Sequence, residues 1–294
     1  MGGWSNPPDR PPNALRARQE PALDLHPSVS DRLAALAALR DAWPVPPDEP
    51  ADDPAARRRR QHAAWANAGV EGNPVTWPSA CALFDGDRPA DGGVADAELR
   101  GCLAAVDFLD SEPDAFALPW RPGLIRHVHG LLLAPGTGVA GGGDYRAHPV
   151  QIVRESGPER GRVVFAPPHP ARVPALMESL LDGLDPGADP FLQAAVFHYE
   201  FQSIHPFADG NGRLGRLLST ALARRGWAGR GFYVAPAVKR AGAGYYLALR
   251  AVRPDYQTEP RNGLRPWVVP FLGMLEDALR HPEPPPATDA RSSA

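Results

Sequence analysis

The segment His205-Pro206-Phe207-Ala208-Asp209-Gly210-Asn211-Gly212-Arg213-Leu214-Gly215-Arg216 contains a histidine, a carboxylate, three glycines and two arginines. Apolar residues recur at spacings of three and four on both sides of it, which predicts one amphipathic helix before the segment and another after it. Pro206 cannot continue the first helix, and the second is expected to run from near Gly212 to near Gly226. The segment is therefore predicted to be the joint between two helices.

The start of the second helix has the features of an anion site. A helix N-terminus already carries unpaired N–H groups and a partial positive charge, so Arg213 and Arg216 are unfavourable there unless an anion binds. Asp209 beside a phosphate suits a hard divalent cation, and His205 is placed to accept a proton from a hydroxyl. The glycines that would let backbone N–H groups approach a phosphate are Gly210, Gly212 and Gly215. The pattern predicts transfer of a phosphate-linked group from a nucleotide to an alcohol.

Two other motifs fit the same glycines less well. Gly210 to Gly215 matches G-x-G-x-x-G, but no apolar strand precedes it, as a dinucleotide-binding motif requires. Asp209 to Gly212 is similar to part of a calcium loop, but no glutamate follows at the closing position.

The segment resembles the signature of Fic domains, His-Pro-Phe-x-(Asp/Glu)-Gly-Asn-(Gly/Lys)-Arg with a second arginine three residues on, at every position. The resemblance implies an all-α Fic fold, a helical bundle with a small β-hairpin flap. It also implies a protein adenylyltransferase that moves AMP from ATP to a Ser, Thr or Tyr hydroxyl of a target protein. In these terms His205 is the general base and Asp209 the Mg²⁺ ligand. The implied phosphate contacts are Asn211 and Arg213 for the α and β phosphates and Arg216 for the γ phosphate.

A second resemblance lies upstream, in the segment Asn67-Ala68-Gly69-Val70-Glu71-Gly72-Asn73. Asp53 followed by a proline predicts a helix that starts at 54 and ends by 72, and Glu71 at its C-terminus opposes the helix dipole. The segment is similar to the inhibitory motif of Fic proteins, Ser/Thr-x-x-x-Glu-Gly/Asn. On that resemblance Glu71 pairs with Arg216, blocks the γ-phosphate position and inhibits the enzyme within one chain. Asn67 stands where the family has Ser or Thr.

Two short apolar stretches predict a hairpin. The first strand consists of Val150, Gln151, Ile152 and Val153, and the second covers 163–165 after a polar turn. The hairpin resembles the flap of Fic domains, which docks a target segment by strand addition. Tyr245 and Tyr246 resemble a tyrosine pair near the adenine pocket of many Fic domains, although Arg253 stands where several relatives have an asparagine.

Other helices are expected after Ser28 to Trp43 and over 95–109, 122–133, 173–184, 191–204, 245–252 and 267–279. The predicted organisation is a disordered Pro-rich tail (1–25), an N-terminal helical region with the inhibitory helix at 54–72 (26–118), a catalytic core with the flap at 148–166 (119–280), and a disordered tail (281–294).

Composition narrows the class of protein. The net charge of −3 gives no reason to expect binding to nucleic acid or to an anionic membrane. No signal or membrane-spanning segment is evident, which predicts a cytoplasmic protein. Cys81 and Cys102 match no metal spacing and are expected to be reduced. Four consecutive arginines, 57–60, are expected on a solvated helix surface. A single lysine and 36 prolines suggest a GC-rich bacterial genome.

Three alternative functions remain open from the sequence. A related enzyme would transfer another nucleotide or phosphate group, or remove AMP with Glu71 orienting a water. A regulatory module would bind ATP without catalysis, but it would be expected to lack the base that His205 supplies. A toxin half of a toxin–antitoxin pair would carry its inhibitor on a separate chain. A homodimer that clamps the inhibitory helix is a further expectation.

Overall fold

The computed structural model describes residues 26–46, 49–89, 93–133, 136–138, 142–153, 161, 163–227, 229–252 and 263–284. The predicted disordered tails and Arg253 lie outside these ranges, except for 281–284. The elements are α1 (Pro27–Asp41), α2 (Pro54–Val70), α3 (Trp77–Asp85), α4 (Val94–Ser111), η2 (Pro113–Phe116), α5 (Pro122–Leu132), β1 (Ile152–Val153), β2 (Val163–Phe165), η3 (Pro170–Arg172), α6 (Val173–Asp182), α7 (Pro190–Ile204), α8 (Asn211–Ala223), α9 (Val234–Ala241), α10 (Ala243–Ala251) and α12 (Arg265–Arg280). The predicted helical fold with one hairpin is confirmed for the described residues.

Two helices that matter for the site begin in the same way. Asp53 accepts hydrogen bonds from the backbone N–H groups of Ala55 and Ala56, and Asp189 does the same at the start of α7. In each helix a proline occupies the first position, where no N–H is needed. These caps fix where α2 and α7 start. The site residues lie at the other ends of the two helices, at Glu71 and His205.

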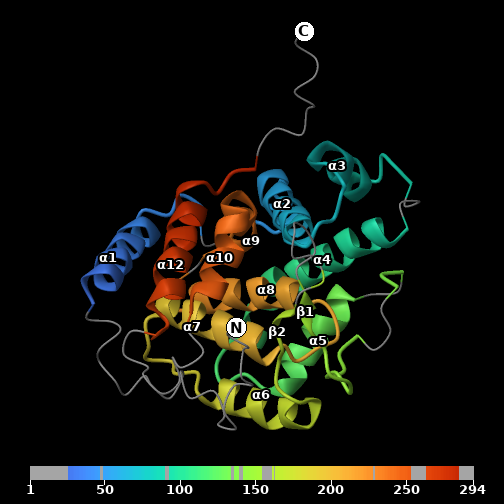
Figure 1. Ribbon diagram of the computed structural model, residues 1–294. Helices are drawn as coiled ribbons and strands as arrows, with labels where there is room; N and C mark the ends of the chain where they lie inside the picture. Colours follow the sequence, from blue (N-terminus) through green and yellow to red (C-terminus); the bar gives the residue numbers. More distant parts are fainter. Residues whose placement is uncertain are drawn as a thin grey trace.

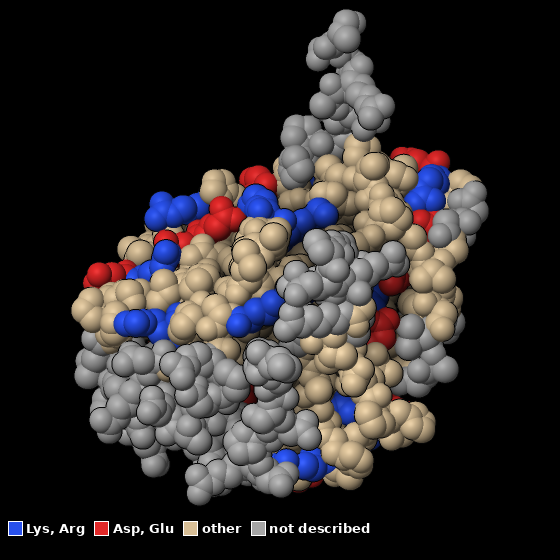
Figure 2. Space-filling view, in the orientation of Figure 1, with Lys and Arg blue, Asp and Glu red and all other residues tan. Residues whose placement is uncertain are grey.

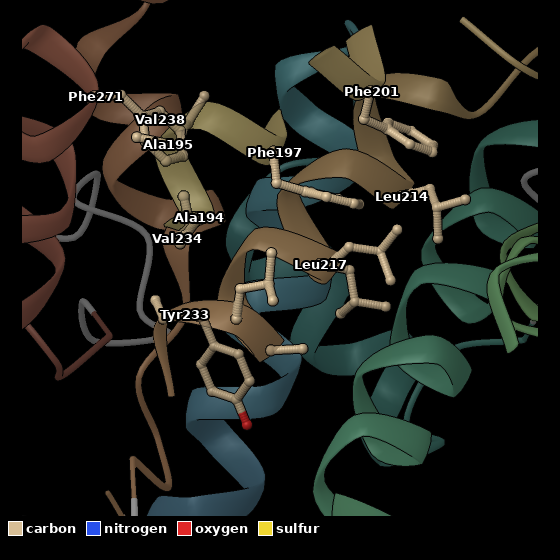
Figure 3. Packing of buried hydrophobic residues seen from close by; sticks show 14 of the residues in the cluster. Ala194, Ala195, Phe197, Phe201, Leu214, Leu217, Tyr233, Val234, Val238 and Phe271 are labelled. Carbon is tan, nitrogen blue, oxygen red and sulfur yellow. The ribbon is translucent and has the colours of Figure 1, made fainter. Parts of the chain in front are cut away.

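Helices α7 and α8 pack against each other along their lengths and form the centre of the bundle. Phe197 and Phe201 from α7 meet Leu214 and Leu217 from α8 in the buried cluster shown in Figure 3. All four side chains are buried, so the joint between the two helices rests on a well-packed core. The rigid pair carries the segment 205–216 at one end.

The remaining helices surround this pair (Figure 1). Helix α12 contacts α1, α7, α9 and α10, while α2 packs between α4 and α9 and also touches α8. α2 therefore reaches α8, although the two are far apart in the sequence.

The hairpin is shorter than predicted. β1 and β2 are antiparallel, with Ile152 opposite Phe165 and Val153 opposite Val163, and the register is irregular between these pairs. Val150 and Gln151 were predicted to be part of the first strand but lie before it, so that part of the prediction is wrong. Pro149 precedes them, and a proline has no N–H to give to a strand ladder.

Two helices were not predicted, α3 and α9. No side-chain hydrogen bond caps the start of either helix, but Thr76 at the N-cap of α3 and the proline two residues later are a start signal that the sequence analysis did not use. α9 is held instead by packing against α2 and α12.

Charges on the described surface are mixed. Figure 2 shows basic and acidic side chains next to each other on the face drawn. The expectation that the four arginines are all solvated is wrong for Arg59, which is 4% exposed and pairs with Glu49 and Glu283. Among the described helices, none is long and apolar enough to span a membrane.

Candidate active site

The joint between α7 and α8 is held in an uncommon backbone conformation. His205 has φ 50° and ψ 60°, the left-handed region, and its N–H donates to the carbonyl of Phe201 at 3.0 Å. Gly210, with φ 77°, precedes the first residue of α8 and takes the same region without a side-chain clash. His205 and Gly210, both in the left-handed conformation, reverse the chain between the helices and leave the N-terminus of α8 next to the loop.

The Asn211 side chain closes the loop before α8. It accepts from the Phe207 N–H at 3.0 Å and donates to the Phe207 carbonyl at 2.9 Å. The residue is 2% exposed, so both ends of the amide are used to close the loop. The backbone N–H of Asn211 lies at the first position of α8, where N–H groups have no partner within the helix.

A buried histidine that the sequence analysis did not single out supports Asp209, the predicted metal ligand. His129 on α5 stacks on Phe207, with ring centroids 3.7 Å apart. Its Nδ1 accepts from the Gly143 N–H at 2.8 Å, so Nε2 carries the proton and donates to the Asp209 carbonyl at 3.0 Å. This fixes the backbone of Asp209. His129 is 80 residues from Asp209 in the sequence, so no local pattern could reveal the contact between them.

Arg213 is buried and lies between two carboxylates. One Nη donates to Asp209 Oδ2 at 2.9 Å, and the other lies 3.3 Å from Glu98 Oε1. Its Nε and Nη1 have no hydrogen-bond partner in the described part of the chain. Buried donors without acceptors are costly, so an anion at this position would stabilise them.

Arg216 is fully buried and bound by the end of α2. Glu71 Oε1 lies 2.7 Å from Nη2, so the predicted ion pair is present. Asn67 accepts from Nε through its side chain at 2.7 Å and from Nη2 through its carbonyl at 3.0 Å. Burial lowers the pKa of Arg216, but the charge of Glu71, the hydrogen bond to Glu71 and the nearby Tyr245 and Tyr246 together outweigh burial and leave the pKa raised. The guanidinium is charged and its Nη1 lacks a partner among the described residues.

Asn67 also binds the helix itself. Its side-chain amide donates to the Arg213 carbonyl at 3.1 Å, and the residue is 2% exposed. Its donor and acceptor thus bridge α2 to α8 at two successive arginines of the motif. The asparagine that stands here in place of Ser or Thr thus makes hydrogen bonds through both its amide nitrogen and its amide oxygen.

Two glycines of α8 are required by close approaches. A Cβ on Gly212 would lie 2.2 Å from Glu71 Oε1, and one on Gly215 would lie 2.3 Å from Nε2 of Gln202. Gln202 donates to the Asn211 carbonyl at 3.1 Å. Gly212 therefore admits the glutamate, and Gly215 admits the amide that ties α7 to α8.

His205 is placed as a neutral base. Burial lowers its pKa to about 4, and the charge of Arg146 adds to the lowering, while a backbone hydrogen bond, Glu71 and Asp209 oppose it. The ring is therefore uncharged at neutral pH. Nδ1 is buried without a hydrogen-bond partner among the described residues. An uncharged ring with an unused nitrogen is suited to accept a proton.

The tyrosine pair is divided between core and surface. Tyr245 is 2% exposed and its hydroxyl lies 2.8 Å from Nε2 of buried His198, which does not favour direct contact with a nucleotide. Tyr246 is more exposed, and its hydroxyl donates to the Val70 carbonyl at 2.9 Å, next to Glu71. The two residues support the region behind Arg216 and the end of α2.

The donor set suits a cation only in combination with a substrate. The described residues contain no group of three or more His, Cys, Asp or Glu side chains that could hold a metal ion. Asp209 is 49% exposed and its Oδ1 accepts from the Gly210 N–H at 2.6 Å. Mg²⁺ is commonly bound by one or two carboxylates together with substrate phosphates and water, and one exposed carboxylate beside an anion site fits that pattern.

Together the fold and the site define a helical-bundle protein with an anion-site loop at a helix N-terminus and a carboxylate held over it. The model of the Fic/DOC family matches residues 119–223 of the chain. That range runs from before α5 to the end of α8 and contains every residue of the segment 205–216.

Several relatives support this placement. The protein adenylyltransferase Fic of Drosophila willistoni is 28% identical over 220 residues, which cover 68% of this chain and 38% of the relative. A probable protein adenylyltransferase of Aquifex aeolicus is 42% identical over 60 residues, 20% of this chain and 19% of the relative. A Fic family protein from Desulfovibrio desulfuricans G20 superposes with a TM-score of 0.72 at 28% identity, covering 89% of this chain and 75% of that one. The chain spans less than half the length of these curated relatives.

Proposed function

We propose that this protein transfers AMP from ATP to a hydroxyl group of a target protein. The observation that carries the proposal is the neutral, largely buried His205 directly before a helix start that holds two buried arginines. The curated relatives named as protein adenylyltransferases favour this transfer over that of another phosphate-linked group.

In the proposed reaction the target hydroxyl attacks the α phosphorus. His205 takes the hydroxyl proton, the new oxygen–phosphorus bond forms, and the bond to the bridging oxygen of the β phosphate breaks, so pyrophosphate leaves. The backbone N–H groups at the start of α8 and the donors of Arg213 would hold the phosphates and stabilise the developing charge. Asp209 would hold Mg²⁺, which supplies positive charge at the phosphate oxygens.

The resting chain is proposed to be inhibited by its own α2. Glu71 occupies Arg216, which is the proposed γ-phosphate ligand, and Gly212 allows the carboxylate to lie directly against the helix start. A γ phosphate at Arg216 would have to displace the carboxylate, because like charges at this distance repel. ATP bound with Glu71 in place would lack its γ-phosphate contact and would be poorly oriented for attack.

We further propose the division of the chain that the sequence suggested. Residues 26–118 would form the regulatory region that carries α2, and 119–280 would form the catalytic core with the flap at 148–166. The family match begins at 119, in agreement with this boundary. The flap, with Ile152 and Val153 as its first strand, would dock the target segment by strand pairing.

The test uses ATP labelled at the α phosphate with magnesium. Wild type, Glu71→Gly and Glu71→Gly/His205→Ala are compared for autolabelling and for labelling of a bacterial lysate. We expect label with Glu71→Gly and its loss in the double variant. If neither Glu71 variant nor wild type transfers label while ATP still binds, the proposed transfer is wrong.

A further inference from the structure

Arg146 is a buried arginine that binds only carbonyl groups among the described residues. It is 5% exposed and lies between the glycine-rich segment and β1. Its guanidinium donates to the carbonyls of His205 at 2.8 Å, Ile204 and His148 at 3.4 Å each, and Pro168. No carboxylate in the described ranges neutralises it, and burial lowers its pKa. Burying an arginine in this way is costly, so its contacts need an explanation beyond general packing.

The first contact explains how His205 keeps its conformation. His205 is the single non-glycine residue with positive φ in the described chain. Such a conformation is costly for a residue with a side chain and persists only when the surroundings fix it. It turns the His205 carbonyl out of α7, where Arg146 Nε binds it, and the backbone N–H of Arg146 binds the next carbonyl, that of Pro206, at 2.9 Å. One residue therefore satisfies both carbonyls of the turn.

The other contacts connect this turn to the flap. His148 precedes β1 and Pro168 follows β2, and Arg146 binds the carbonyls of both. The same guanidinium thus holds the two ends of the hairpin together and attaches them to the C-terminal end of α7. That end carries a partial negative charge, which favours a cation.

Only arginine can make this set of bonds. Its planar guanidinium presents five N–H donors in fixed directions, whereas a lysine at the same position would bring one point charge with three rotatable donors. The carbonyls belong to three chain segments that are not neighbours in sequence, so losing the fork would release them from one another.

We propose that Arg146 is a positioning residue for the transfer reaction, which holds His205 in its left-handed conformation and fixes the flap relative to it. The inference rests on the proposed function, because Arg146 would align His205 with the hydroxyl of a target segment that is docked on the flap. Arg146 touches no reacting atom in this scheme. It acts through His205 and through the ends of the flap.

The test is made in the Glu71→Gly background with Arg146→Met and Arg146→Lys. Arg126→Met is the matched control, because Arg126 also donates to a carbonyl, that of Gly143, but is half exposed and does not contact His205. Affinity for MgATP is measured by calorimetry, the rate of AMP transfer by single turnover at saturating ATP, and folding by thermal denaturation.

We expect both Arg146 variants to lower the single-turnover rate by about 10- to 100-fold, since a displacement near 1 Å at a reacting group costs about that much. Affinity for MgATP is expected to stay within about threefold of the parent. The Arg146 contacts position His205 and the flap, so their loss should destabilise the transition state and not the bound nucleotide. A parallel loss of affinity and rate, or a rate equal to that of Arg126→Met, would overturn the proposal. Arg146→Lys preserves the positive charge. If Arg146→Met does not fold, the single-turnover rate of Arg146→Lys tests whether the guanidinium contacts are needed.

A second measurement does not depend on transfer. Hydrogen exchange is followed at the amides of residues 204, 205, 207 and 163–166 in the wild-type chain, Arg146→Met or Arg146→Lys, and Arg126→Met. Faster exchange in both segments only in the Arg146 variants supports the contact, and unchanged exchange refutes it. If Glu71→Gly itself transfers no label, the proposed function fails, while the exchange pattern still decides whether Arg146 holds His205 and the flap.

Discussion

The end of α2 and the flap both reach the catalytic joint, but they are held in different ways. α2 packs against α4 and α9, and Asn67 and Glu71 bind Arg216 with three contacts of 2.7–3.0 Å. The flap has strands of two and three residues with an irregular register, and it is attached to the joint through Arg146. The nucleotide side of the site is thus closed by well-packed residues, whereas the side proposed for the hydroxyl is formed by a minimal hairpin. Under the proposed function, regulation would depend on the well-packed end of α2, and target binding would depend on the small hairpin.

The largest effect should come from the base at which both regions meet. In the Glu71→Gly background, His205→Ala is expected to lower the rate of AMP transfer by on the order of 10²–10⁴-fold, the usual contribution of a general base. The measurement is single-turnover transfer at saturating MgATP. Because Asn211 closes the loop without His205, nucleotide affinity should change little. A variant that retains most of the rate would remove His205 from the mechanism.

Next in size is the effect of releasing Arg216 from α2. Glu71→Gly is expected to raise AMP transfer by roughly 10- to 100-fold, within the range of coupling energies seen for regulatory contacts. The matched control is Glu112→Gly, since Glu112 caps the C-terminus of α4 as Glu71 caps that of α2 but has no contact with Arg216. Equal rates for wild type and Glu71→Gly would show that the ion pair does not restrain catalysis.

A smaller release is expected from Asn67. Asn67→Ala removes two side-chain hydrogen bonds, to Arg216 Nε and to the Arg213 carbonyl, but leaves Glu71 in place. Leaving buried groups unpaired should lower the free energy of unfolding by about 1–3 kcal/mol, and transfer should rise by less than in Glu71→Gly. Urea denaturation and the labelling assay measure the two quantities. Asn73→Ala, whose side chain binds α4, should lower stability without raising transfer.

The dense packing of α2 also predicts a pH effect on stability. Burial lowers the pKa of His62 on α2 to about 4, and the charges of Arg240 and Lys239 add to the lowering. Below the ordinary pKa of 6.5 the unfolded ring binds a proton that the native ring refuses, so stability falls as the pH drops from 6.5 towards 4. At pH 5 the free energy of unfolding should be lower by about 2 kcal/mol because of His62.

His62→Phe should remove that share of the acid sensitivity, because the ring stacks on Trp65 and meets Trp77 edge to face, and a phenyl ring can make both contacts. Urea denaturation at pH 7.5 and pH 5 gives the comparison with wild type. Exposed His148→Phe is the control and should leave the pH dependence as it is. Identical pH dependence for wild type and His62→Phe would contradict the prediction.

The smallest effect is expected in the flap. Ile152→Ala should change the free energy of unfolding by no more than about 0.5 kcal/mol, because a two-stranded hairpin adds little to the core. Denaturation in urea measures this. A loss comparable to that of Asn67→Ala would mean that the flap is as firmly held as α2, and the contrast between the two regions would disappear.

What the sequence could predict was local or carried by a motif. The ends of α2 and α7 were predictable because Asp–Pro caps and Pro206 are read from neighbouring residues. The pairing of Glu71 with Arg216 was predictable from the resemblance to the inhibitory motif, and the dipole argument added that Glu71 and the motif arginines each oppose their own helix dipole. These features need no knowledge of the tertiary structure.

The contacts that were missed depend on tertiary packing. His129 binds a carbonyl 80 residues away and Arg146 one 59 residues away, and neither leaves a local pattern. Arg59 looked like part of a solvated run but is buried by Glu49 and by Glu283, which follows α12. Tyr245 was expected near adenine, yet its hydroxyl meets buried His198 in the core.

The most direct test of the central claim is a crystal structure of Glu71→Gly with magnesium and a non-hydrolysable ATP analogue. The account predicts that the γ phosphate lies on Arg216, that the α and β phosphates lie against the start of α8 and Arg213, and that the α phosphorus faces the side of the loop where His205 stands. A triphosphate bound away from Arg216, or an α phosphorus out of reach of any hydroxyl that His205 could deprotonate, would contradict it.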